Sequence, residues 1–252
     1  GFRDVFNVTL VGIKVSNGKL VGKNTNLSME SVHMRNTHIN PYAMQRPKHA
    51  HALSRGLVSH YGLANQTRAG CPRSNTTAAG IFKFSKQQVP RIAILNRKNE
   101  SGRSLQNEME LSHLIESDVF HNEVPVVYFE GKSFLEQVEL FASVDILISP
   151  HGAQLTGVGF MPRCGSVVEI FPMGYCVPDF FSSLAFSAGL EYRSFYASNG
   201  DRANETAYWM RDVQLRRKAR SRQICTDAGP IVEEVRRLVG KWRQCCAASA
   251  TT

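Results

Sequence analysis

The residues best suited to binding chemistry follow, or lie within, short apolar runs of this sequence. A guanidinium follows one run, a histidine with a glycine-led turn follows a second, and a carboxylate lies within a third: Arg97, His151, Gly152, Ala153, Gln154 and Glu169. Free amides at a helix start that opens on a glycine bind phosphate well, and a guanidinium makes the paired contact that a diphosphate prefers. A carboxylate accepts hydrogen bonds from a sugar or ribose diol. Together these groups indicate a pocket for a nucleotide diphosphate.

Each of these residues also has a purely structural interpretation. His151 can satisfy a backbone carbonyl in a tight turn, and Arg97 can be a solvated loop charge. Glu169 is harder to explain in this way, because a carboxylate in an apolar strand costs free energy unless it has a partner or lies at the strand's open end. The common position of these residues near the ends of predicted strands favours the functional interpretation.

The spacing of apolar residues predicts alternating strands and helices from residue 90 onward. The predicted strands are residues 91–95, 124–129, 145–149, 166–171 and 190–196. The predicted helices are residues 107–117, 133–143 with a Ser-x-x-Glu capping box, a short helix from 153, 178–187 and 231–243. This alternation predicts an α/β fold with a Rossmann-like, doubly wound parallel sheet. Ligands bind such a sheet at the carboxyl ends of its strands, where Arg97 and His151 are expected to lie.

The first part of the chain has a weaker pattern. Two strand-like runs, residues 4–15 and 19–21, flank a turn at 16–19, and residues 43–62 can form a helix that Pro47 interrupts near its start. We therefore expect two domains: a basic, loop-rich segment over 1–89, and the Rossmann-like domain with a C-terminal helix over 90–252. The chain begins with neither an initiator Met nor a signal-peptide pattern, which predicts a mature product or a fragment. No run approaches eighteen apolar residues, so no membrane span is predicted.

The formal net charge of +9 is unevenly distributed along the 252 residues. Residues 1–90 carry twelve Lys and Arg against two acidic residues, 91–212 carry nine against sixteen, and 213–252 carry nine against three. Such basic surfaces suit phosphate, anionic lipid or an acidic glycan, although a solvated face without a partner explains them equally well. No zinc-finger spacing, RNA-binding motif or bZIP pattern accompanies the charge, so we expect no nucleic-acid partner.

Glycosylation sequons and cysteines favour the lumen of the secretory pathway. The Asn-x-Ser/Thr sequons exceed the about two that chance predicts, and begin at Asn7, Asn26, Asn65, Asn75, Asn99 and Asn204. The six cysteines permit disulfides. A Cys164–Cys176 pair is disfavoured because a strand of about 20 Å separates the two, beyond a Cα–Cα limit of about 7 Å. Cys71 can pair with one of the C-terminal cysteines. The chain has no C-x-x-C pair to support structural zinc or thioredoxin-type redox chemistry.

Three sequence blocks between residues 90 and 196 occur in a characteristic order. The first block, ILNRK (94–98), combines a predicted strand with an arginine. The second lies in a predicted helix and comprises SFLEQV and LFAS (133–138 and 140–143). The third comprises DILISPHGAQLT, FMP and VVEIFP (145–156, 160–162 and 167–172). In this order and spacing the blocks resemble the motifs of glycosyltransferase family 61.

The resemblance implies a GT-B fold, in which the C-terminal of two Rossmann-like domains holds most of the nucleotide-sugar donor. It implies inverting transfer from a UDP-sugar to a glycan or glycoprotein acceptor in the ER or Golgi lumen, by a type II membrane protein whose N-terminal anchor lies outside this chain. By motif match, Arg97, His151 and the amides of Gly152–Gln154 hold the diphosphate, and Glu169 holds a nucleoside hydroxyl. No cofactor beyond the donor substrate is expected. No metal is expected either, because the chain lacks Asp-x-Asp and cationic groups can stabilise the leaving UDP.

The chain departs from the family pattern at two points. Gln154 stands where many members have Gly, and about ninety residues before the donor domain are too few for a full acceptor-side domain, so the N-terminal domain is expected to be incomplete. The catalytic base must reach the acceptor hydroxyl; His151 is a candidate, but a role at the phosphate competes, and the base stays unassigned. The alternative function is a non-catalytic glycan-binding protein or a degenerate transferase.

Overall fold

A computed structural model describes residues 13–16, 19–22, 47–62, 71, 89–120, 122–175, 179–197 and 213–249 of the chain. The chain divides into two compact units, Gly1–Ala43 and Met44–Thr252. The first contains an antiparallel hairpin of β1 (Ile13–Ser16) and β2 (Lys19–Gly22), in which Ser16 pairs with Lys19. This hairpin confirms the predicted turn, and the earlier part of the predicted strand 4–15 lies outside the described residues.

The boundary between the two units differs from the one expected between residues 89 and 90. Helix α3 (Pro47–His60) belongs to the second unit, where it packs against helices that cover the sheet. It begins at Pro47, which fits the first turn of a helix because its missing N–H leaves no bond unmade. The earlier part of the predicted helix, residues 43–46, lies outside the described residues. That residues 1–89 are part of an acceptor-side domain stays a prediction.

Five parallel strands form the sheet of the second unit and confirm the α/β fold class. Across the sheet, their order is β4 (Val126–Tyr128), β3 (Ile92–Asn96), β5 (Ile146–Pro150), β6 (Ser166–Phe171) and β7 (Glu191–Tyr196). Each corresponds to a predicted strand, and β6 has the predicted bounds.

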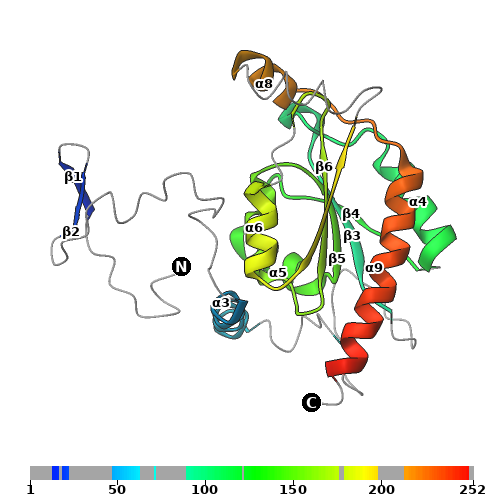
Figure 1. The fold of residues 1–252 in the computed structure, drawn as a ribbon, viewed down its shortest axis with the longest axis horizontal. Coiled ribbons are helices and arrows are strands. Elements are labelled where there is room, and N and C mark those ends of the chain that lie inside the picture. The colour runs from blue at the N-terminus through cyan, green and yellow to red at the C-terminus, as the bar shows by residue number, and fades with distance from the viewer. Residues whose placement is uncertain are drawn as a thin grey trace. The chain divides into compact units, whose positions relative to one another are not determined.

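Helices cover both faces of this sheet, with α4 and α9 on one face and α5 and α6 on the other (Figure 1). In chain order the helical elements are the 3-10 turn η2 (Asn99–Ser101), α4 (Glu108–Ile115), the π-helical turn η3 (Glu116–Phe120), α5 (Phe134–Ser143), the 3-10 helix η4 (Ala153–Phe160), α6 (Asp179–Ser187), α8 (Val213–Arg220) and α9 (Ala228–Ser249). Helix α8 was not predicted, because four of its eight residues are Arg or Lys. Within the described ranges, no helix is both long and apolar enough to cross a bilayer.

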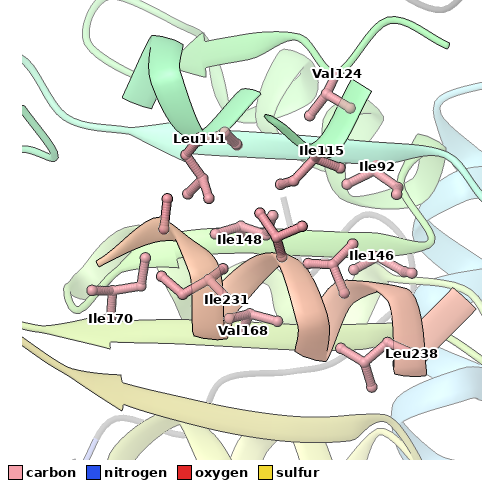
Figure 2. Packing of buried hydrophobic residues seen from close by; sticks show 14 of the residues in the cluster. Ile92, Leu111, Ile115, Val124, Ile146, Ile148, Val168, Ile170, Ile231 and Leu238 are labelled. Carbon is pink, nitrogen blue, oxygen red and sulfur yellow. The ribbon is translucent and has the colours of Figure 1, made fainter. Parts of the chain in front are cut away.

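Alternate side chains of each buried strand point to opposite faces of the sheet. On β3, Ile92 and Ile94 pack in one cluster with Leu111 of α4 and with residues of α9. Figure 2 labels Ile92 and Leu111 in this cluster. Ala93 and Leu95 pack on the other face, with α5 and α6. Burial on both faces explains why the strands are uninterrupted apolar runs, and each fully buried aliphatic side chain contributes about 1.5–3 kcal/mol.

Helix α5 begins at the predicted capping box. The Ser133 hydroxyl accepts a hydrogen bond from the Glu136 N–H, and the Glu136 carboxylate accepts one of 2.7 Å from the Ser133 N–H. The backbone N–H and the hydroxyl of Ser133 both donate to this carboxylate and lower the pKa of Glu136. Further along α5, the ring of Phe141 lies where a Cβ on Gly157 would be, so this glycine lets α5 pack tightly against η4.

The strand order places a topological switch point between β3 and β5. The chain leaves β3 through α4, forms β4 on one side of β3, and returns through α5 to form β5 on the other side. The connections that follow β3 and β5 therefore diverge to opposite faces of the sheet. Such divergence opens a crevice at the carboxyl ends of the two strands, which is where ligands bind in sheets of this type.

Two disulfides tie the end of α9 to the rest of this unit. Cys71 pairs with Cys246, and Cys164 pairs with the adjacent Cys245. The first pair confirms that Cys71 bonds to a C-terminal cysteine. The second confirms that Cys164 does not pair with Cys176, as the length of β6 indicates.

Candidate functional site

The crevice between β3 and β5 brings together the two sequence elements that were expected to share a site. Arg97 follows the last residue of β3, and Gly152 lies in the turn that follows β5. A Cβ added to Gly152 would overlap Nη1 of Arg97 and lie 3.6 Å from its Cζ. The Arg97 guanidinium therefore lies directly against the Gly152 backbone, and any side chain at this position would displace it.

A second guanidinium, that of Arg103, reaches the same point from the loop after β3. Its Cζ lies 3.9 Å from the position of a Cβ on Gly152. Arg103 is 9% exposed, its Nε has no hydrogen-bond partner among the described atoms, and its φ of +58° is in the left-handed region. Such a backbone costs about 1–2 kcal/mol for a non-glycine residue, and strain of this kind concentrates at functional sites. Arg103 was not predicted, because an arginine in a polar loop carries no signal of its own.

Hydrogen bonds from two directions fix the loop that carries both arginines. The buried Asn96 amide donates to the Leu105 carbonyl at 3.0 Å and accepts from the Leu105 N–H at 2.9 Å. The Glu130 carboxylate, after β4, accepts from the Lys98 N–H at 2.9 Å and from the Ser101 hydroxyl at 3.0 Å. Burial raises the pKa of Glu130, but these bonds outweigh it, and the pKa lies below its ordinary value. Glu130 is therefore an ionised anchor of the loop.

Positive charge accumulates in this crevice. Burial, and then the nearby charges of Arg97 and Arg220, lower the pKa of Arg103 to about 10. Burial also lowers the pKa of Arg97, which the Glu130 charge raises and the Arg220 charge lowers. Arg103 remains protonated at neutral pH, so the guanidiniums repel one another. A bound phosphate would relieve this repulsion and accept paired hydrogen bonds from them.

His151 is buried beside the same turn, and its ring is held in one orientation. Nδ1 lies 2.5 Å from Oε1 of Glu169, and the ring stacks on Phe171 with centroids 4.8 Å apart. The rings of Tyr175 and Phe181 flank it at centroid distances of 5.1 and 5.3 Å. Because a carboxylate only accepts hydrogen bonds, its contact with Glu169 puts a proton on Nδ1, and Nε2 is the nitrogen left for other groups.

Glu169 is placed as the buried partner of His151. Its side chain is fully buried, and the Tyr192 hydroxyl of the neighbouring β7 donates to Oε2. Both carboxylate oxygens thus have a protein partner, which is how an apolar strand accommodates the charge. The sequence predicts that Glu169 either has a partner or lies at the strand's open end, and the structure supplies two partners. A contact between Glu169 and a nucleoside hydroxyl stays a prediction.

The start of η4 supplies backbone amides next to the arginines. The first backbone bond of this helix runs from the Leu155 N–H to the Gly152 carbonyl at 2.9 Å. The N–H groups of Ala153 and Gln154 precede this bond, and the first amides of a helix have no partner within it. Their binding of a diphosphate stays a prediction that this placement favours.

The Gln154 side chain turns toward the strands. Its Nε2 donates to the Ser149 hydroxyl of β5 at 2.7 Å and to the Leu95 carbonyl of β3 at 3.2 Å. The glutamine that departs from the family pattern therefore bridges the two strands at the switch point.

The parallel sheet and the cationic crevice at its switch point define a doubly wound α/β domain with a site suited to an anion. The sequence profile described as Glycosyltransferase 61 matches residues 27–168, which is more than half of the chain. The chain belongs to this family.

Curated relatives carry transferase names. The mouse (Mus musculus) protein named Protein O-linked-mannose beta-1,4-N-acetylglucosaminyltransferase 2 is 31% identical over 164 residues, which cover 60% of this chain and 25% of that protein. The dog (Canis lupus familiaris) protein of the same name is 36% identical over 119 residues, 47% of this chain and 17% of that protein. The EGF domain-specific O-linked N-acetylglucosamine transferase of Drosophila melanogaster is 30% identical over 109 residues, 43% of this chain and 20% of that protein. The matched part of the chain thus spans a quarter or less of each relative.

His151, Glu169 and Tyr192 should behave as one energetic unit. We expect Tyr192→Phe to lower the free energy of unfolding by about 1 kcal/mol, and Glu169→Gln by about 1.5–3 kcal/mol because it removes a charged acceptor. The double variant should lose less than the sum, by about 0.5–1 kcal/mol, since Tyr192→Phe removes and Glu169→Gln weakens the same hydrogen bond. Urea unfolding of the four proteins measures this coupling. If the two losses in the free energy of unfolding were strictly additive, Tyr192 and Glu169 would not be energetically coupled.

Proposed function

We propose that the whole protein is an inverting glycosyltransferase that moves a sugar from a UDP-sugar to a glycan or glycoprotein acceptor, and that the Met44–Thr252 unit holds the donor. The observation that carries this proposal is the convergence of the Arg97 and Arg103 guanidiniums on Gly152 at the switch point of a parallel sheet. Membership of the family and the names of the relatives support the reaction class. A GT-B architecture, which would pair this unit with a second Rossmann-like domain, is part of the proposal.

The crevice would act mainly on the leaving group. In an inverting transfer the acceptor oxygen attacks the anomeric carbon, the bond from that carbon to the UDP oxygen breaks, and the acceptor proton passes to a base. Negative charge grows on the diphosphate as this bond breaks, and Arg97 with the amides of Gly152–Gln154 would stabilise it. Fixed cations in this position, together with the absence of Asp-x-Asp from the sequence, support a metal-independent mechanism.

His151 is suited to one of two roles beside the diphosphate. With its proton on Nδ1, the neutral ring can accept the acceptor proton at Nε2, whereas the doubly protonated ring can donate to a phosphate oxygen. We keep His151 as the candidate base and propose that Glu169 orients it. A direct bond from Glu169 to a nucleoside hydroxyl would require one carboxylate oxygen to leave His151 or Tyr192.

The acceptor and the compartment follow from separate observations. The names of the relatives refer to O-linked mannose on protein and to EGF domains, which supports a protein-linked acceptor here. Two disulfides and six sequons support the ER or Golgi lumen, because disulfides persist in oxidising compartments. Attachment to the membrane through an N-terminal anchor outside this chain is part of the proposal.

A non-catalytic, glycan-binding function is the alternative. The twelve basic and two acidic residues of the segment 1–90 favour it, since such a surface suits an acidic glycan. Retention on heparin, with neither UDP binding nor donor hydrolysis, would support this alternative over the transferase.

Removing the Arg97 guanidinium should weaken UDP binding. We expect Arg97→Ala to lower the affinity for UDP about 10- to 100-fold, because a charge-assisted hydrogen bond contributes about 1.5–3 kcal/mol. Isothermal titration calorimetry measures the affinity. Lys98→Ala, at the exposed next residue, is the matched control and should bind like the wild type. Undetectable binding at millimolar UDP, or an Arg97→Ala variant that binds like the wild type, would contradict the proposed function.

Adding a single methyl group at Gly152 should lower the affinity for UDP with little effect on the stability of the fold. The new Cβ meets the flexible end of Arg97 rather than backbone, so we expect Gly152→Ala to change stability by about 1 kcal/mol or less and UDP affinity by at least about tenfold. Gly159→Ala, where a Cβ meets nothing within 4 Å, is the control in η4, the helix that follows Gly152. Equal UDP affinities of the two variants, measured by calorimetry, would show that the Arg97–Gly152 contact does not form the site.

A further inference from the structure

An open pocket of about 410 Å³ adjoins the cationic crevice through Arg103, which takes part in both. Ser101, Gly102 and Arg103 line it from the loop after β3, and Arg217, Arg220 and Ser221 line it from α8 and the residue that follows. Helix α8 lies beyond one end of the sheet (Figure 1). Residues far apart in the sequence therefore form one basic pocket beside the switch point.

Backbone pairing fixes the end of α8 to the loop after β3. The Arg103 N–H donates to the Arg222 carbonyl at 3.0 Å, the Ile224 N–H to the Ser104 carbonyl at 2.8 Å, and the Gln106 N–H to the Ile224 carbonyl at 2.8 Å. Gly102 permits this approach, since it has a φ of +64° and a Cβ there would lie 3.2 Å from the Ser221 carbonyl oxygen. The two sides of the pocket are thus held at a fixed separation.

The guanidinium of Arg220 is placed by the aromatic wall that also holds His151. Ala219 is buried against Phe171 and Tyr175, and the Arg220 Cζ lies 5.9 Å from the centroid of the Tyr175 ring. The Arg220 side chain is otherwise exposed, so its donors are accessible to a ligand. It lies close enough to the two crevice arginines for its charge to lower the pKa of both.

The positive charges of this pocket exceed the carboxylates around it. The acidic residue in the described lining is Glu100, which is exposed at the rim. Glu130 is committed to the backbone of Lys98 and the hydroxyl of Ser101. The buried Nε of Arg103 has no partner among the described atoms. The pocket lining therefore holds three guanidiniums, those of Arg103, Arg217 and Arg220, and little negative charge to balance them. Such a site suits a ligand with more than one negative charge.

We propose that Arg103 and Arg220 form a second anion subsite, which binds one phosphate of a nucleoside diphosphate while Arg97 and the Gly152 turn bind the other. This inference rests on the proposed function for its ligand, and it adds α8 to the donor site. Because each phosphate has its own guanidinium, α8 makes the site selective for a diphosphate over a monophosphate. Arg220 is a binding residue in this proposal, and Tyr175 positions it.

The test compares UDP, UMP and inorganic pyrophosphate on the full chain by calorimetry. We expect Arg220→Gln to weaken UDP and pyrophosphate binding about 10- to 100-fold and UMP binding less than about threefold. Lys218→Gln, at an exposed residue of α8 outside the pocket lining, is the matched control and should change none of the three affinities. Arg220→Lys should fall between the wild type and Arg220→Gln, because an ammonium keeps the charge and loses the paired geometry. Unfolding curves of all variants check that α8 remains folded.

Two outcomes would overturn this inference, and they differ in whether the proposed function also fails. If the wild type binds UDP and Arg220→Gln binds it equally well, α8 is no part of the site, and the proposed function is unaffected. If the wild type binds neither UDP nor pyrophosphate, the anion subsite and the proposed function both fail. Binding of pyrophosphate without UDP, lost in Arg220→Gln, would keep the anion subsite and contradict the proposed UDP-sugar donor.

Discussion

Two like charges held against one glycine are the constraint on which the rest of this site depends. The guanidiniums of Arg97 and Arg103 both lie within 4 Å of the position of a Cβ on Gly152. They repel each other in a partly buried crevice, where charge interactions are stronger than in water. Asn96 and Glu130 hold the loop that carries them, so the repulsion cannot be relieved by moving the loop. An anion can relieve it, and the switch point of the sheet is where an anion can enter.

Residues of β6 and β7, with the turn that follows β5, build the other half of the site as one connected layer. His151 follows β5, its partner Glu169 lies on β6, and Tyr192 on β7 donates to Glu169. Phe171, at the end of β6, stacks on His151 and also contacts Ala219 of α8. A ring fixed in this way needs little reorganisation to exchange a proton or a hydrogen bond with a ligand, which is what a preorganised site requires.

The sheet and the pairing of Arg97 with the His151 turn could be predicted from the sequence, whereas Arg103 and Arg220 could not. The strands are apolar on both faces, so each is visible as a continuous run, and the carboxyl ends of parallel strands meet at one edge. Arg103 and Arg220 converge only through backbone pairing between residues 103–106 and 222–224, which no local pattern encodes. Glu169 was predicted to have a partner or to lie at the strand's open end, but Tyr192 could not be named as its partner, because the register of β6 and β7 is a tertiary property.

The most direct test of the central claim is a crystal structure of the protein with UDP bound. We expect the diphosphate between the carboxyl ends of β3 and β5, with phosphate oxygens within about 3 Å of guanidinium nitrogens of Arg97 and Arg103. UDP bound elsewhere on the molecule, with both guanidiniums still packed on Gly152 and without a phosphate partner, would contradict it.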